Sequence, residues 1–477
     1  MKFIFLLVFV FSFTNLFSQN IITKANIQTT AVAGTGDSLP FWFLQNNLGK
    51  YSKNYNVQEL TEGEISGEFL LSGNKRLFYG TDLAILAKNN DFDLDILKIH
   101  TGFNLFSGCF KTHFDAKIIQ LYAGLKGKIL TIKAGTFSDE EILGGLSSSN
   151  GEIVRSLNYR PYPMVRLSTS GYIPFIFAHK WFRFKAEYDE GLLHDNRVIY
   201  HPHLHHKSLD MLFLVGNSWQ ITAGFNHYVF WGGTSSDGEK LPGGFSDYLR
   251  YISGSSGSSD FWIGDQINVA GDQLGSYRVT AKKDLDNYSV QFRICHLFED
   301  NSGMRLKNWR DNLLSLYIVK KKNHTFLDEF LAEFLYTKDQ SPNSINEYDN
   351  YFNHSVYRTG FSYKGFCMGD PLFYPLKTNS DGVYSGFENN RISSFNFGAK
   401  GFFTERINYK AMFSYSHNFG TYGNHYDYTK KQFSSMFKIS MKCRRFPLDV
   451  YANFAADFGD LLSNSLGLGI GCRWNLY

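Results

Sequence analysis

At residues 182–188 the sequence reads FRFKAEY, a strict alternation of apolar and charged side chains. Successive side chains of a β-strand point to opposite faces, so this two-residue period predicts a strand with one apolar and one polar face. The same alternation recurs along the rest of the chain, in residues 288–295, 409–415, 437–442, 448–454 and 466–476. The chain is therefore predicted to be all-β.

Three features favour lipid rather than water outside these strands. The alternating segments run about ten residues, which suits a tilted membrane strand better than the shorter strands of soluble sheets. Aromatic residues make up 17% of the chain and crowd the segment ends, as interfacial girdles require. After the first 18 residues no apolar run approaches the length of a membrane-spanning helix. We expect a transmembrane antiparallel β-barrel in the outer membrane, in contact with its lipid.

The first residues predict export. Lys2 precedes an apolar stretch at residues 3–13, and Ser18 is a small residue suited to cleavage. We expect residues 1–18 to be a signal peptide and residues 19–477 to form a single barrel domain. The first cysteine is Cys109, so lipid attachment at a cysteine just after the signal is not expected.

Composition and motifs exclude several other classes. The net charge of +4 is too small to favour nucleic acid as a partner. Five dispersed cysteines without a C-x-x-C pair do not indicate a zinc or disulfide framework. The sequence has no H-E-x-x-H, G-x-S-x-G or P-loop pattern. We expect a monomer that is not an enzyme and needs no cofactor or metal.

Loop lengths predict an orientation and two local structures. Short links at residues 402–406 and 444–447 alternate with longer polar links at 378–390 and 420–431. Periplasmic turns are short and extracellular loops are long, so the longer links are expected outside the cell. Residues 327–336 fit either a strand or a helical face, and the barrel context favours a strand. Residues 245–252 are predicted to form a short helix capped by Ser246.

An ordered series of motifs resembles the capsule assembly Wzi family. It contains WGGTS at residues 231–235, followed by DYLR at 247–250. Further motifs stand in the family order: RPYP at 160–163, LHHK at 204–207, LGSY at 274–277, FED at 298–300 and EFLYTK at 333–338. The resemblance covers about Phe41 to Gly369 and implies an outer-membrane barrel of about eighteen strands, with a small helical element closing the periplasmic side.

The same resemblance implies a binding function without catalysis, because bacterial relatives attach capsular polysaccharide to the cell surface. The expected partner is therefore capsular or exopolysaccharide. The first alternative is a porin or channel for small polar solutes or saccharides. The second is an outer-membrane hydrolase.

The WGGTS segment and the predicted helix contain four candidate glycan contacts. Trp231 and Tyr248 could stack on sugar rings, while Arg250 and Lys207 could pair with the carboxylates of an acidic glycan. The competing interpretation is that these residues lock a loop to the barrel wall, with glycines at 232–233 allowing the bend. We expect this segment to fold inward and narrow the pore.

A second set of candidates lies in the predicted extracellular loop at residues 420–431. Tyr422, Tyr426 and Tyr428 would be exposed there beside Lys430 and Lys431. Exposed rings can stack on sugar faces, and nearby cations suit an acidic polymer.

Four histidines, His201, His203, His205 and His206, are dense enough to raise the possibility of zinc or copper binding. Strand alternation would send their side chains to different faces. We expect instead that they form hydrogen bonds with the barrel wall.

Overall fold

The computed structural model describes residues 21–71, 73, 75–89, 113–267, 269–322, 324–342 and 348–476. The predicted signal peptide and Cys109 lie outside these residues. None of the described helices is long and apolar enough to cross a membrane.

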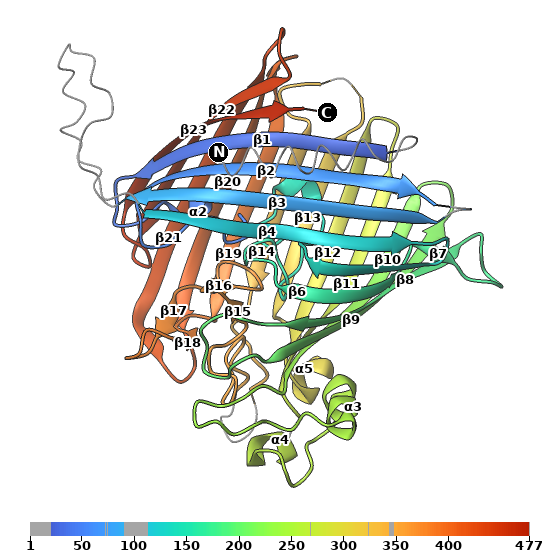
Figure 1. Cartoon of the computed structure of the whole chain (residues 1–477), viewed down its shortest axis with the longest axis vertical. Coiled ribbons are helices and arrows are strands. Elements are labelled where there is room, and N and C mark those ends of the chain that lie inside the picture. The colour runs from blue at the N-terminus through green and yellow to red at the C-terminus, as the bar shows by residue number, and fades with distance from the viewer. Residues whose placement is uncertain are drawn as a thin grey trace.

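Eighteen antiparallel strands form a closed barrel, as the sequence predicted (Figure 1). Each strand pairs with the next along the barrel, and β1 pairs with β23 to close it. The wall strands are β1 (Ile21–Gly34), β2 (Val57–Leu70), β3 (Arg76–Asn89), β4 (His113–Lys126), β5 (Leu130–Thr136), β6 (Pro163–Thr169), β8 (Phe182–Leu192), β9 (His203–Val215), β10 (Trp219–Trp231), β11 (Asp272–Asp284), β12 (Tyr288–Phe298), β13 (Asn312–Lys320), β14 (Glu329–Tyr336), β19 (Ile392–Thr404), β20 (Ile407–Gly420), β21 (His425–Lys442), β22 (Leu448–Gly459) and β23 (Ser465–Asn475). Residues 327–336, which also fitted a helix, therefore contain strand β14.

The shorter elements lie in the connections. They are the strands β7 (Ile173–Pro174), β15 (Ser362–Tyr363), β16 (Phe366–Cys367), β17 (Leu376–Thr378) and β18 (Tyr384–Phe387), the helices α2 (Phe41–Leu44), α3 (Phe245–Ser253), α4 (Ile263–Ile267) and α5 (Asn301–Met304), and the 3₁₀ turn Leu143–Gly145.

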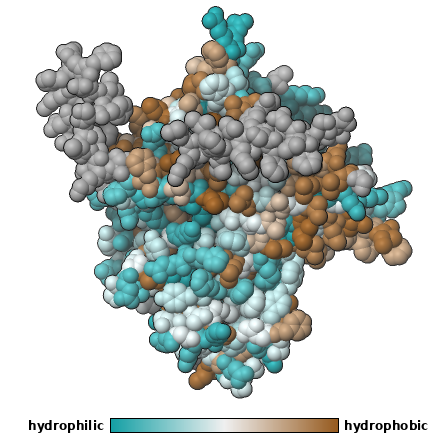
Figure 2. Space-filling model, viewed as in Figure 1, coloured by the Kyte–Doolittle hydropathy of each residue, from teal (hydrophilic) through white to brown (hydrophobic). Residues whose placement is uncertain are grey.

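The wall has an apolar outer face. On β23, Leu468 and Ile470 are 52% and 61% exposed, and they alternate with Gly467 and Gly469 on the inner face. Figure 2 shows hydrophobic residues gathered over the strands and mostly hydrophilic residues over the loops and helices at the lower end. This distribution suits a wall surrounded by lipid.

The two ends of the barrel differ in their connections. Long segments, including residues 137–162, 232–271 and 337–391, join strands at one end, the loop end. Short links, such as residues 285–287 and 405–406, join strands at the other, the turn end. Helices α3, α4 and α5 lie at the loop end, at the bottom of Figure 1. By the general rule for such barrels, the loop end is extracellular.

A plug fills the lumen at the loop end. It consists of residues 41–44, 137–162 and 351–373, and most of its apolar side chains pack against the inner wall in one buried cluster, with smaller clusters around Phe43 and around Leu146. Ile153, Phe352 and Phe373 are completely buried there. Trp42 donates a hydrogen bond from Nε1 to Ser414 Oγ on β20, over 3.3 Å. The lumen is therefore closed by loop segments and the short helix α2.

The segment after Trp231 does not belong to this plug, so the predicted inward fold was wrong. Alternation along β10 points Phe230 inward and Val229 outward. Tyr251 and Phe261, from the segment that follows Trp231, pack around Val229 on the outer wall. Because Val229 and Trp231 at the end of β10 face outward and pack with Tyr251 and Phe261, α3 covers the outside of the barrel.

The predicted helix at 245–252 is nevertheless present as α3, although its cap differs from the prediction. The helix begins after Gly244, whose backbone N–H donates to Asp247 Oδ2 over 3.0 Å, and Ser246 lies inside the helix. The predicted glycine bend is confirmed, since residues 232 and 233 have φ of 61° and 94°.

Candidate functional site

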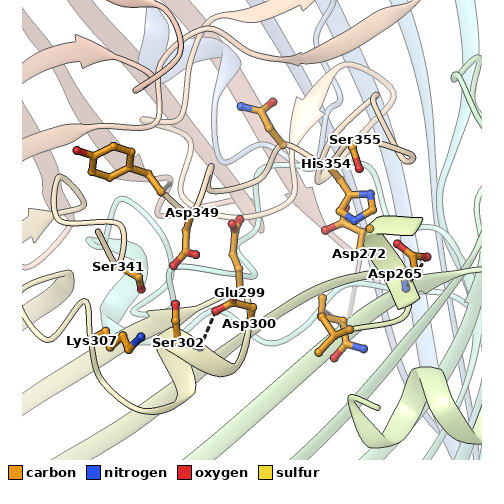
Figure 3. A pocket seen from close by; sticks show the side chains of 16 residues that line it. Asp265, Asp272, Glu299, Asp300, Ser302, Lys307, Ser341, Asp349, His354 and Ser355 are labelled. Atoms are coloured by element: carbon orange, nitrogen blue, oxygen red, sulfur yellow. Dashed lines mark hydrogen bonds between the residues drawn. The ribbon is translucent and has the colours of Figure 1, made fainter. Parts of the chain in front are cut away.

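A cavity of about 650 Å³ opens at the loop end, and we call it the loop-end cavity (Figure 3). Its walls come from the segment around α4 up to Gln273, from residues 299–307 around α5, and from the long link between β14 and β19, at residues 341, 348, 349 and 353–355. Its charged and hydrogen-bonding side chains are Asp265, Asp272, Gln273, Glu299, Asp300, Ser302, Lys307, Ser341, Tyr348, Asp349, Asn353, His354 and Ser355. A volume of this size is typical of sites for small molecules or a few sugar residues.

Local backbone contacts fix the carboxylates of the cavity. Asp300 caps α5 by accepting hydrogen bonds from the N–H groups of Ser302 and Gly303, over 2.7 and 3.3 Å. Glu299 Oε1 accepts the N–H of Phe352 over 2.7 Å, which connects the cavity to the plug. In Figure 3, Glu299 and Asp349 reach into the same space from different loops.

Burial and neighbouring negative charge raise the pKa of two of these carboxyls, Glu299 and Asp349. Burial, reinforced by the negative charge of Asp349, raises the pKa of Glu299 well above its ordinary value. Burial, with Asp300 nearby, raises the pKa of Asp349 to about 7. A protonated carboxyl both donates and accepts hydrogen bonds, which matches the hydroxyl groups of a sugar.

The described residues offer these groups no metal-binding arrangement. No cluster of three or more His, Cys, Asp or Glu side chains in that part of the chain has the geometry to hold a metal ion.

Two stacked tyrosines border the cavity. The rings of Tyr348 and Tyr422 lie 3.6 Å apart with an interplanar angle of 11°. The Arg391 guanidinium lies 3.9 Å from the centre of the Tyr422 ring, so both faces of that ring are covered. Tyr422 also donates a hydrogen bond to the Lys338 carbonyl over 2.8 Å. A sugar ring at this border would therefore stack on the far face of Tyr348, with Tyr422 as its support.

The other two predicted loop tyrosines lie in a strand. The predicted loop at 420–431 is shorter than expected, because β21 begins at His425 and leaves only residues 421–424 between the strands. Tyr426 is half-buried, with Lys430 Nζ 4.2 Å from its ring centre. Tyr428 is 61% exposed. Tyr428 is thus open to a ligand at the rim, whereas Tyr426 packs beside a lysine.

Three of the four candidates near WGGTS do come together, but as a packing interface. The rings of Trp231 and Tyr248 are 5.0 Å apart, and Lys207 Nζ donates to the Ile252 carbonyl at the end of α3. The fourth, Arg250, donates to the Ser256 carbonyl over 3.2 Å. These contacts hold α3 and the loop after it against the outer wall, and a role of the four residues in glycan contact stays a prediction.

The histidine cluster separates as alternation predicted. His205 Nδ1 lies 2.7 Å from Glu190 on the outer face, and His206 Nδ1 lies 2.9 Å from Asp189 on the inner face. His203 stacks on Trp231 at 4.3 Å. These histidines therefore contact wall residues, with His203 and His205 on the outer face and His206 on the inner face.

Sequence reasoning missed Tyr348, Asp349 and Glu299 as site residues. Glu299 and its neighbour Asp300 stood within the family-like series, but as a motif and without a role. Tyr348 and Asp349 follow no periodic pattern, since they lie in a long loop. The only signal was a polar, aromatic loop between two wall strands.

No family model and no curated protein matches this chain. Among solved structures, it is similar to Wzi of Escherichia coli, described as an outer-membrane carbohydrate-binding β-barrel involved in group 1 capsule assembly. The identity is 14%, the TM-score is 0.52, and the match covers 94% of this chain and 84% of Wzi. OccK8 (OprE) of Pseudomonas aeruginosa matches with 8% identity, a TM-score of 0.48 and coverage of 96% and 98%. OccAB2 of Acinetobacter baumannii matches with 12% identity, a TM-score of 0.45 and coverage of 95% and 98%.

At these identities the likeness concerns the fold. With the closed eighteen-stranded barrel and its apolar outer wall, it identifies the protein as an outer-membrane β-barrel.

Proposed function

We propose that the protein binds capsular or exopolysaccharide at the cell surface without catalysing a reaction, as a distant relative of the Wzi family. The observation that carries this proposal is the loop-end cavity, a carboxyl-lined pocket bordered by the Tyr348–Tyr422 stack above a plugged lumen. Aromatic faces and paired hydrogen-bonding groups are the two features that recognise sugar rings. A plugged barrel offers a rigid support for such a site.

The carboxyl groups that line the cavity indicate which kind of sugar unit it would bind. The carboxyl groups of Glu299 and Asp349 can both donate hydrogen bonds to sugar hydroxyls and accept hydrogen bonds from them, so we infer that a neutral sugar unit enters the cavity. Arg391 and Lys338 stand at the border, over the rings of Tyr422 and Phe419. An acidic unit of the same polymer would lie there, outside the cavity.

A channel for small polar solutes is the alternative function. The plug argues against a steadily open pore, because its apolar residues are completely buried against the wall. Large, steady single-channel currents from the purified protein in planar bilayers would favour the channel over the binding function.

The test is retention of surface glycan. Cells without the protein should make and export the polymer normally, but shed more of it into the medium. Tyr348→Ala removes the ring on which a sugar would stack, so it should reproduce much of the increased shedding. Stacking on one aromatic ring contributes about 1 kcal/mol.

A matched control is Tyr415→Ala, which removes an aromatic ring that is 42% exposed on the outer wall of β20. It should leave retention unchanged. If total polymer falls without a rise in the shed fraction, the binding proposal is wrong and a role in export replaces it.

A further inference from the structure

A second cavity of about 650 Å³ lies at the turn end of the barrel, and we call it the turn-end cavity. It is bounded by the link between β13 and β14 and by the inner faces of β19, β20 and β21. Its polar and charged side chains are Lys320, Lys321, Lys322, His324, Asp328, Glu329, Lys400, Asn408, Tyr409, Lys410, Lys438 and Ser440. Cations thus outnumber anions in this cavity.

Three of these lysines form a row across neighbouring strands. In the strand register, Lys410 stands opposite Lys400 on one side and opposite Lys438 on the other. Residues directly opposite in antiparallel strands have Cβ atoms roughly 5 Å apart, and like charges in such positions destabilise the sheet. The row faces the lumen, because Phe397 and Phe413 on the alternate face of these strands are exposed on the outside.

Carboxylates lie near this row without pairing directly with it, and one of them, Glu141 of the plug, lines a neighbouring pocket with Lys410. None of the three lysines forms an ion pair with another described residue. Glu329 stands opposite Lys400, but its carboxylate accepts a hydrogen bond from the Tyr317 hydroxyl. Lys438 Nζ lies over the Tyr451 ring at 3.9 Å. Three like charges are therefore held side by side around a cavity that could hold a counter-charge.

We propose that the turn-end cavity binds a small phosphate-bearing anion, such as free pyrophosphate or the phosphate group of a sugar or lipid headgroup. Lysine ammonium groups are compact point charges that bind phosphate in many proteins, and several of them around one cavity suit its multiple negative charges. Asn408 and Ser440 form the pair two residues away from Lys410 and Lys438 on the same strands and the same face, and they add hydrogen-bonding groups beside the lysines. The cavity lies against the inner face of the wall and is too small to admit a folded protein.

This site is independent of the glycan proposal. The plug reaches as far as Lys410, but the loop-end cavity and the turn-end cavity share no lining residue, so substitutions in one leave the lining of the other unchanged. By the same rule of orientation, the anion would reach this cavity from the periplasm.

The experiment is calorimetric titration of the full chain in zwitterionic detergent with sodium pyrophosphate at low ionic strength. Lys410→Gln removes the central charge of the row and should weaken binding about tenfold to a hundredfold, as expected for loss of one charged hydrogen bond. Lys410→Arg keeps the charge and should retain binding. Lys240→Gln is the control, since it removes one exposed lysine from the α3 segment at the loop end.

A second readout keeps the test informative. Lys410→Gln relieves repulsion in the row, so without an anion the variant should unfold at the same or a higher temperature than the unmodified protein. Heat-modifiable migration on gels verifies that each variant forms a closed barrel. No binding by the unmodified protein, or equal weakening in Lys240→Gln, overturns the site. Citrate binding as tightly as pyrophosphate overturns its assignment to phosphate.

Discussion

Replacing Phe352 with alanine should open the plug while leaving the barrel wall intact. Phe352 is completely buried, and its ring lies 4.3 Å from that of Phe373 and 5.8 Å from that of Phe361. Its neighbours come from the loop segments of the plug. The substitution therefore removes packing that belongs to the plug and none that belongs to the ladder of strands.

The magnitude follows from the volume lost. A buried Phe→Ala change costs about 3 to 5 kcal/mol, because it removes apolar contacts and leaves a cavity. Phe352 has a φ of 66°, and alanine cannot relieve that left-handed conformation, so nothing offsets the loss. About 4 kcal/mol corresponds to a roughly thousandfold rise in the equilibrium for local opening of the plug.

Hydrogen exchange measured segment by segment provides the assay. Amides in residues 351–373 should exchange roughly a thousandfold faster in the variant, while strand amides keep their protection. Phe413→Ala is the control, since it removes a ring that is 42% exposed on the outer face of β20. If strand amides lose as much protection as the plug, or the plug loses none, the plug is not a separate packing unit.

Two further predictions concern the same end of the barrel. Arg155 joins the plug to the wall through its ion pair with Asp189 of β8 at 3.4 Å, and it also pairs with Asp139 inside the plug at 2.7 Å. Arg155→Met should destabilise the plug by about 2 kcal/mol. This is less than the cost of breaking an isolated buried ion pair, because Arg166 still neutralises Asp189. Hydrogen exchange of the plug amides measures the loss. The raised pKa of Asp349, about 7, means that the folded loop end favours the protonated carboxyl. Its contribution to stability is full below the ordinary carboxyl pKa of about 4 and is lost progressively as pH rises from there to about 7. Amides of residues 299–311 should therefore lose protection between about pH 4 and pH 7, and Asp349→Asn should flatten this dependence.

Local alternation was sufficient to predict the wall. The pattern at residues 182–188 appears as strand β8, and the C-terminal pattern at 466–476 appears as β23. Side-chain direction in a strand depends only on the neighbouring residues, so the period of the sequence determines which face each residue occupies. The same rule separated His205 from His206 correctly.

The direction of the α3 segment could also have been derived from this rule. Phe230 and Trp231 are consecutive, so they must face opposite sides of the wall. With Phe230 inside, the segment that leaves Trp231 begins at the outer face. A glycine bend after Trp231 permits either direction, so the bend by itself did not predict an inward fold.

The plug and both cavities were decided by tertiary structure. The rings of Tyr348 and Tyr422 stack, and Glu299 accepts the N–H of Phe352, although the residues of each pair are 53 or more positions apart in the chain. Lys400, Lys410 and Lys438 form a row only because the register aligns three separate strands. A local sequence pattern specifies which face a residue occupies, but the partner on that face depends on strand register and loop packing. These are set by contacts summed over the whole barrel, which is why the strands were predictable and the binding sites were not.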